Sequence, residues 1–324
     1  MMKMMMQIPM MALLLALTAS ARADTYPSKQ VTIVVPFAAG GGSDLLARLV
    51  AQKLEEKFIK PFIIENRPGA ATTLAAMQVV RSAPDGYTLM QATSSTMAIN
   101  VSMAKKLAYE PLKDLVPVAL LSSSPFFLVV NKDLPVKSVA DLVALAKSKP
   151  NGLNYGSGGP GSMHHLSTEL FESLTGIKMT HVPYKATPPA MNDLLAGHIQ
   201  VLFGDTTSVL PFIRQGTVRP LGVTTAKRSP AEPEVPAVGE TVPGFESASW
   251  QMLVAPGATP PEVIARLNRE VHAIFSDPGV IKELERRGVG PALTGKPEEV
   301  REFVKKEIVR WSGIVRRAGL EHSQ

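Results

Sequence analysis

Short apolar segments alternate with segments of helical periodicity along almost the whole of this 324-residue chain. The apolar segments predict strands at residues 31–35, 61–65, 87–92, 126–130, 153–155, 200–203, 221–224 and 250–254. The periodic segments between them predict helices at residues 44–58, 72–82, 139–148, 163–174 and 190–196. This alternation predicts an α/β fold with mainly parallel sheets covered by helices on both faces.

The end of the chain has a different pattern. A proline-rich passage at 226–249 leads to Trp250, and three predicted helices follow at 261–275, 278–287 and 297–317, each with Pro near its first position. A chain of about 300 residues exceeds the usual size of a single core, so two domains are expected. We predict a first lobe from residues 24–124 plus 247–324 and an inserted second lobe from 125–246, joined by a two-crossing hinge.

Residues 1–23 have the pattern of a secretory signal peptide. Lys3 provides a positive start, residues 10–18 are uninterruptedly apolar, and Ala21 and Ala23 are small residues before Asp24. The apolar run is about half of the roughly 20 residues that a membrane span requires. We therefore expect cleavage near Ala23 and a soluble mature chain outside the cytoplasm.

Composition excludes several classes of function. The chain has no Cys, which rules out disulfides, thiol catalysis and thiolate metal sites. Loss of Lys3 and Arg22 with the signal peptide lowers the net charge from +6 to +4, which is too mild and too dispersed to indicate nucleic-acid binding. No cofactor or metal site is predicted.

The segment at 31–50 predicts an anion site made from backbone. An apolar strand ends at Pro36, three glycines follow at 40–42, and an amphipathic helix begins, with Ser43 as a candidate cap. Uncovered amides at the positive end of a helix attract carboxylate or phosphate. Asp44 suits the helix dipole but would repel an anion, so it could instead hold the loop amides or accept an ammonium group.

A second glycine loop, residues 156–162, again lies between a short strand and a helix. Gly156, Gly158 and Gly161 formally fit the dinucleotide pattern G-x-G-x-x-G. Against a dinucleotide site, Pro160 stiffens the turn, no strong strand precedes it, and the chain is predicted to be exported. One glycine loop in each lobe would hold both ends of a molecule with two anionic groups across a cleft.

Two further positions follow predicted strand ends and would line the same crevice, as ligand sites in open α/β sheets do. These are Ser94, within 93–96, and Asp205, within 203–208. Asp205 is also a candidate helix cap.

Hydrolase chemistry has little support. No G-x-S-x-G motif occurs, and the histidines show no metal-ligand spacing. We expect His165 to hold the second loop by a hydrogen bond. The enzyme alternative would use His165 and Asp205 as acid and base on a carboxylated substrate.

Taken together, a set of motifs along the mature chain resembles the Bug-type extracytoplasmic receptors of tripartite tricarboxylate transporters. The motifs lie at 36–44, 66–70, 83–89, 155–157, 182–185, 226–230 and 243–245, with Gly161, His165, Leu166 and Trp250. The chain departs from the family pattern where Ala71, Thr72, Thr73 and Ala75 replace a glycine-rich run, and where Ala186 replaces a glycine. The bulkier Thr72 and Thr73 would narrow the cleft.

The resemblance implies a type II periplasmic binding fold, in which two α/β lobes close on a small carboxylate held largely by main-chain groups of the two loops. The candidate ligand-binding residues are Phe37, Ala38, Ala39, Gly40, Gly41, Gly42, Ser43, Asp44, Ser94, Gly156, Ser157, Gly158, Gly159, Gly161, Ser162 and Asp205.

The resulting hypothesis is a monomeric, non-enzymatic periplasmic receptor. It would capture a mono-, di- or tricarboxylate or an acidic amino acid and deliver it to membrane permease subunits. The sequence leaves open a sensor that is read by a membrane kinase.

Overall fold

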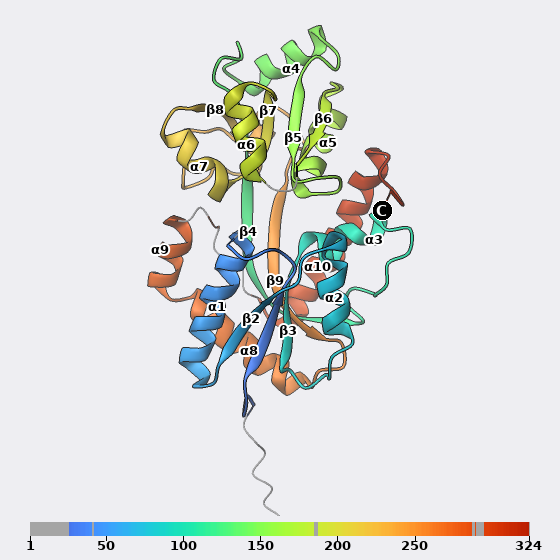
Figure 1. The fold of residues 1–324 in the computed structure, drawn as a ribbon, viewed down its shortest axis with the longest axis vertical. Coiled ribbons are helices and arrows are strands. Elements are labelled where there is room, and N and C mark those ends of the chain that lie inside the picture. The colour runs from blue at the N-terminus through green and yellow to red at the C-terminus, as the bar shows by residue number, and fades with distance from the viewer. Residues whose placement is uncertain (1–25, 41, 185–186, 287–288, 290–294, 324) are drawn as a thin grey trace, which may run out of the picture.

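The computed structural model describes residues 26–40, 42–184, 187–286, 289 and 295–323. It shows two α/β lobes, one above the other, joined by two long strands (Figure 1). The predicted signal peptide lies outside the described residues. Among the helices that the structure describes, none has the length and apolar character to cross a membrane.

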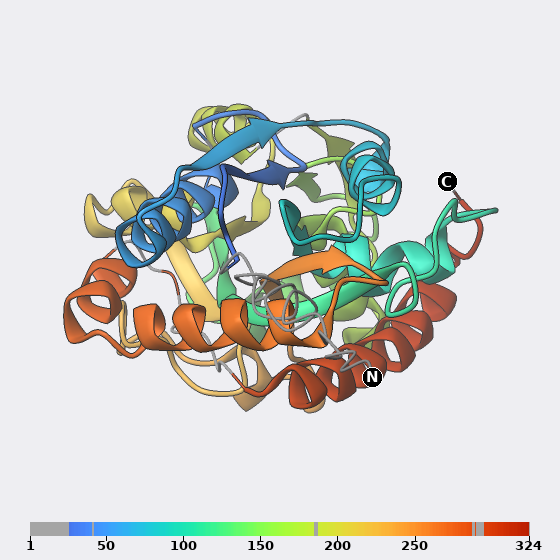
Figure 2. The same ribbon diagram turned by 90° about the horizontal axis from the view of Figure 1, so that it is seen from below.

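The first lobe is built on a sheet of β2 (Phe62–Asn66), β1 (Val31–Val35), β3 (Thr88–Thr93) and the lower parts of β9 (Ala248–Pro256) and β4 (Leu115–Asn131). One face packs on α1 (Gly42–Phe58), α8 (Pro261–Phe275) and α9 (Pro278–Arg286). The other packs on α2 (Thr73–Val80), η2 (Ser95–Ile99), α3 (Asn100–Met103) and α10 (Pro297–Arg317). Figure 2 shows these two groups of helices on opposite sides.

The second lobe has a sheet of β8 (Val218–Val223), the end of β4, β7 (Val201–Asp205), β5 (Asn154–Ser157) and β6 (Thr180–Pro183). Helices α4 (Val139–Ser148) and α5 (Met163–Thr175) cover one face. Helices α6 (Thr187–Ala196) and α7 (Thr206–Arg214) cover the other. Alternation along β4 explains this arrangement, because Phe126 and Leu128 face one core while Phe127 and Val129 face the other.

The expectation of mainly parallel sheets is wrong for half of the pairings in the described structure. Strands β1–β2, β1–β3, β5–β6 and β5–β7 are parallel, whereas β3–β9, β4–β9, β4–β7 and β4–β8 are antiparallel. The chain leaves the first lobe on β4 and returns on β9. Two neighbouring strands that cross a hinge in opposite directions must pair antiparallel.

The crossing strand β4 is also longer than predicted. Residues 126–130 form only its last part, and Ser122–Pro125 also pair with β9. Ser and Pro have low strand propensity, so only the partner strand makes this segment extended. The lobe boundaries at 124/125 and 246/247 remain a prediction.

Most other predicted elements agree with the structure to within a few residues. Three were missed. Strand β6 is largely exposed and lacks an apolar run, helix α7 contains Pro211, and η2 with α3 follows directly on β3. The remaining short helical segments are η1 (Ala70–Thr72) and η3 (Val238–Glu240).

Candidate functional site

Asp44 organises the first glycine loop, residues 37–43. One carboxylate oxygen accepts from the Gly40 amide and from Arg48 Nε, each at 2.9 Å, and the other accepts from Asn66 Nδ2 at 2.8 Å. Burial opposes the charge, but the hydrogen bonds from Arg48 and Gly40 outweigh it and lower the pKa of Asp44. Asp44 therefore holds the loop in shape, and both of its oxygens are engaged within the protein.

The start of α1 differs from the predicted cap. The helix begins at Gly42, so Ser43 lies inside its first turn. The Ser43 carbonyl accepts from Gln91 Nε2 at 2.8 Å, which ties the helix start to β3. Gly41 lies outside the described residues.

Three exposed amides of the first loop remain available. Within the described part of the chain, those of Phe37, Ala38 and Ala39 donate to no protein atom. They lie beside the positive end of α1, where an anion is stabilised.

The second glycine loop, residues 156–162, uses several of its amides internally. The Gly159 amide donates to Ser157 Oγ at 3.0 Å, Gly161 to His165 Nδ1 at 3.0 Å, and Ser162 to the Gly159 carbonyl at 3.1 Å. The expected hydrogen bond between His165 and the loop is therefore present, with His165 as the acceptor. Among the described residues, the Gly158 amide has no acceptor.

The glycines of this loop have different roles. Gly159 and Gly161 have φ values of +104° and +74°, which other residues adopt only with strain. Gly156 instead permits close packing, because a Cβ there would lie 2.6 Å from Ile199 Cδ1 and 3.3 Å from Ala190 Cβ. The absence of a side chain at Gly156 thus lets β5 pack closely against Ile199 and Ala190 inside the lobe. Ser162 caps α5, its hydroxyl accepting from the His165 amide at 3.4 Å.

The two glycine loops lie on facing edges of the lobes. A Cβ built on Gly42, in the first lobe, would be 3.4 Å from Thr207 Oγ1, in the second. Thr207 Oγ1 donates to Asp205 at 2.9 Å, and the other oxygen of Asp205 lies 3.4 Å from His164 Nε2. His164 in turn lies against Gly158, whose Cβ would be 3.2 Å from Nδ1. A continuous set of contacts therefore runs from one loop to the other.

Asp205 is a cap and an orienting group in this arrangement. Its carboxylate accepts from the Ser208 amide at 3.1 Å, which caps α7, and from Thr187 Oγ1. Burial opposes its charge, but hydrogen bonds from His164, Ser208 and Thr187 keep its pKa far below the usual range. A permanent negative charge with both oxygens occupied suits a structural role better than contact with an anion.

Ser94 has a free hydroxyl at the end of β3. Its side chain is fully buried, and within the described structure its Oγ has no hydrogen-bond partner. Ser122 lies on β4, paired with Gln251 of β9, and its buried Oγ also has no hydrogen-bond partner within the described structure. Buried hydroxyls without partners are costly, so they are candidates to meet a ligand or water.

Part of the segment that departs from the family pattern has the left-handed backbone conformation that glycine favours, although these residues are not glycine. Ala70, Ala71 and Thr72 have φ values of 45°, 47° and 76°. The Thr72 side chain is buried, and its Oγ1 accepts from Thr96 Oγ1 at 2.9 Å. Ala186 lies outside the described residues.

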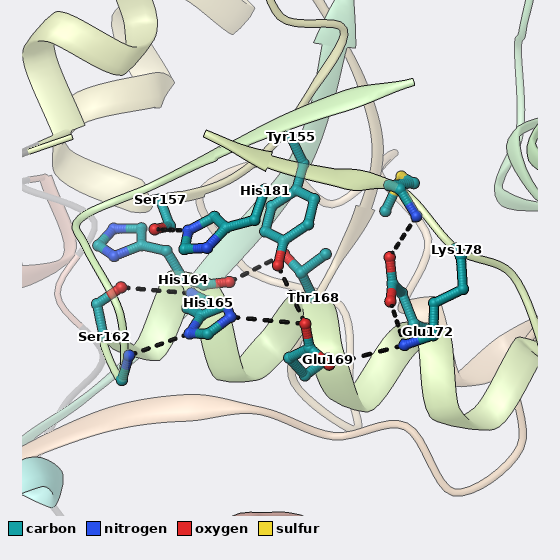
Figure 3. A network of polar contacts seen from close by, with 12 residues as sticks. Tyr155, Ser157, Ser162, His164, His165, Thr168, Glu169, Glu172, Lys178 and His181 are labelled. Carbon is teal, nitrogen blue, oxygen red and sulfur yellow. Dashed lines mark hydrogen bonds and ion pairs between the residues drawn. The ribbon is translucent and has the colours of Figure 1, made fainter. Parts of the chain in front are cut away.

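Sequence reasoning missed a stack of three rings behind the second loop (Figure 3). The His181 ring lies 4.2 Å from that of His165 and 4.9 Å from that of Tyr155, nearly parallel to both. His181 Nε2 contacts Ser157 Oγ at 2.6 Å, and Glu169 accepts from Tyr155 Oη at 3.1 Å. Burial, and then the neighbouring His165, lower the pKa of His181 to about 4.

The acid–base pair of the enzyme alternative is not assembled. His165 points into this stack and contacts Glu169 at 3.5 Å, whereas the histidine beside Asp205 is His164. Among the described residues, no group of three His, Cys, Asp or Glu side chains lies close enough together to hold a metal ion.

Comparison with known proteins identifies the family of this chain. Residues 46–320 match the family described as "Tripartite tricarboxylate transporter family receptor". The chain belongs to this family. "Protein BugT" of Bordetella pertussis is 35% identical over 94% of this chain and 93% of its own length.

Solved structures agree with this assignment and with the two-lobed fold. One of them, "R. palustris Rpa4515 with adipate", has 40% identity and a TM-score of 0.84 over 91% of this chain and 98% of its own. Another, "MatC (Rpa3494) from Rhodopseudomonas palustris with bound malate", has 34% identity and a TM-score of 0.80 over 90% of this chain and 100% of its own. The chain is thus a solute-binding receptor of the tripartite tricarboxylate transporter family.

Proposed function

We propose that this receptor captures a small carboxylate between its two glycine loops and delivers it to the permease of a tripartite tricarboxylate-type transporter. The receptor works as a monomer in the periplasm after cleavage of its signal peptide near Ala23. It binds without chemical turnover.

The closeness of Gly42 to Thr207 carries this proposal. It brings the free amides at 37–39 and the start of α1 against the edge of the second lobe, where α7 begins and Gly158 retains a free amide. Free amides beside a helix start favour negative charge without needing a cationic side chain. The adipate and malate in the titles of two similar structures support a carboxylate as the ligand.

We expect the ligand to drive closure of the two lobes through contacts that form only in the closed state. The lobes close only to the extent that the ligand gains contacts in the closed state that it lacks in the open state. The loop amides on both lobes supply those contacts, because a ligand held by one loop alone would leave the other set of donors unmatched.

A thermal-shift screen of the mature protein tests the proposal. The panel contains mono-, di- and tricarboxylates and acidic amino acids. A ligand at a hundredfold excess over its Kd adds about 2.7 kcal/mol to the free energy of unfolding, which is readily seen. Failure of every carboxylate to shift the transition would contradict the proposal, and turnover of a binding compound would favour an enzyme.

Two glycine substitutions test the assignment of the loops. Gly42→Val adds bulk against Thr207, and Gly158→Val forces the His164 ring away, so both should abolish binding while the protein stays folded. Gly313→Val is the control, because its Cβ meets only the end of Arg317, at 3.7 Å in α10. Normal binding by either loop variant would show that the loops are wrongly assigned.

A further inference from the structure

An apolar cavity opens beside the proposed carboxylate site. It has a volume of about 500 Å³ and is lined by residues of α7 in the second lobe and of α1 and α9 in the first. Figure 1 shows where these three helices lie. Gly42 and Thr207, the two residues that bring the lobes together, line its wall. The cavity is thus continuous with the edge of the site where negative charge is expected, and its volume is within the usual range for small-molecule sites.

Two helices present matched stripes to this cavity. On α1 the lining residues are Gly42, Leu45, Leu46 and Leu49, and on α7 they are Thr207, Leu210, Pro211 and Arg214. Both stripes have the i, i+3, i+4, i+7 spacing of one helix face, which extends about 10 Å from the helix start. Each stripe begins with a small or hydroxyl-bearing residue next to the proposed carboxylate site and continues with apolar side chains, and the α7 stripe then ends at Arg214.

The cavity also carries positive charge. Arg214 lies on the last turn of α7, where Nε contacts Glu232 at 2.9 Å, and Arg286 ends α9. Within the described part of the chain, Arg286 makes no hydrogen bond or ion pair, and no acidic side chain lines the cavity. A second acid group would therefore find a cation there, beyond an apolar wall.

We propose that this cavity seats the apolar body and distal acid group of the ligand, with Arg286 and Arg214 setting specificity. The inference rests on the proposed function, and it narrows the ligand to dicarboxylates whose acid groups are separated by an apolar chain. Short, hydroxylated acids fill only the part of the site between the glycine loops.

Calorimetric titration of the mature protein with succinate, adipate, suberate and octanoate tests this. Suberate should bind at least about tenfold more tightly than succinate, because its added methylenes are buried against leucines. Arg286→Gln should weaken suberate about tenfold and leave octanoate unchanged, since only suberate carries the second charge. Leu45→Trp, at a half-exposed position, should weaken suberate and octanoate but not succinate.

Two matched variants control for general effects. Arg269→Gln changes an exposed arginine on α8, and Leu174→Trp enlarges a partly exposed leucine on α5, both away from the cavity lining. Neither should change any affinity. Equal affinities along the dicarboxylate series, or cavity variants that bind suberate normally, would overturn the cavity assignment and leave the receptor proposal intact. If none of these acids bound and no carboxylate shifted the thermal transition, both the cavity assignment and the receptor proposal would be contradicted.

Discussion

At the scale of single residues, several loop amides are taken by acceptors that the protein itself supplies. Asp44, Ser157 and His165 each accept from an amide of a glycine loop. Their bonds fix the loops before any ligand arrives, so less conformational entropy is lost on binding. The cost is that fewer donors remain, at Phe37, Ala38, Ala39 and Gly158.

Ala71 offers a test of backbone strain at one residue. Its φ and ψ of 47° and 45° are left-handed, and its side chain is exposed. Ala71→Gly should raise the free energy of unfolding by about 1 kcal/mol, because glycine adopts this conformation without steric cost. Urea denaturation measures it.

Ala144→Gly is the matched control, since Ala144 is exposed in the middle of α4. It should lower the free energy of unfolding by about 1 kcal/mol. A loss of stability in both variants would contradict the strained backbone at Ala71.

At the scale of elements, the ring stack joins three segments that are distant in sequence. Tyr155 lies on β5, His181 on β6 and His165 on α5. Strand β6 is mostly exposed and has little apolar surface of its own, so the stack helps to hold it against the lobe. The second glycine loop follows β5 directly and therefore depends on this packing for its position.

The lowered pKa of His181 predicts how the free energy of unfolding depends on pH. Its pKa is about 4 in the folded protein and near 6.5 when unfolded. Between these values the unfolded state binds the extra proton, so stability falls as pH decreases from 6.5 to 4. The loss from this partly exposed ring should be about 1–2 kcal/mol, measured by urea midpoints across this range.

His181→Phe should flatten that slope, although it removes the contact with Ser157 and lowers stability at every pH. His198→Phe is the control, because the His198 side chain is 71% exposed. An unchanged slope in the His181 variant would show that other groups cause the acid sensitivity.

At the scale of the whole molecule, α10 braces the hinge strand β9. The indole N–H groups of Trp250 on β9 and Trp311 on α10 both donate to Glu307 Oε2, at 2.7 and 2.9 Å. Glu307 is buried and also contacts Arg310, which reaches the Glu246 carbonyl at the approach to β9. The C-terminal helix is therefore tied to the strand that carries the chain back from the second lobe.

Glu307→Leu should remove this brace. Two buried indole N–H groups would lose their acceptor, at about 1–3 kcal/mol each, so the free energy of unfolding should fall by about 2–6 kcal/mol. Thermal and urea unfolding measure the loss. Glu302→Leu, at an exposed ion pair on the same helix, should change it by less than about 0.5 kcal/mol. Equal effects of the two substitutions would rule out the brace.

Local patterning was enough to predict most elements, because short apolar runs, proline at helix starts and the αL glycine Gly176 act over a few residues. It failed for β4 at Ser122–Pro125 and for β6, whose extended conformation comes from partner strands. It also failed for the ring stack and for the contact of Thr207 with Gly42, because each joins residues far apart in the chain.

The sequence by itself therefore determined the α/β class, the family and the two glycine loops, since these depend on residue types at fixed spacing. The tertiary structure decided which loop amides stay free, that Asp44 and Asp205 serve the loops and helices around them, and that an apolar cavity with two arginines lies beside Gly42 and Thr207. Hydrogen-bond partners and cavity walls come from separate elements, and only folding brings them together.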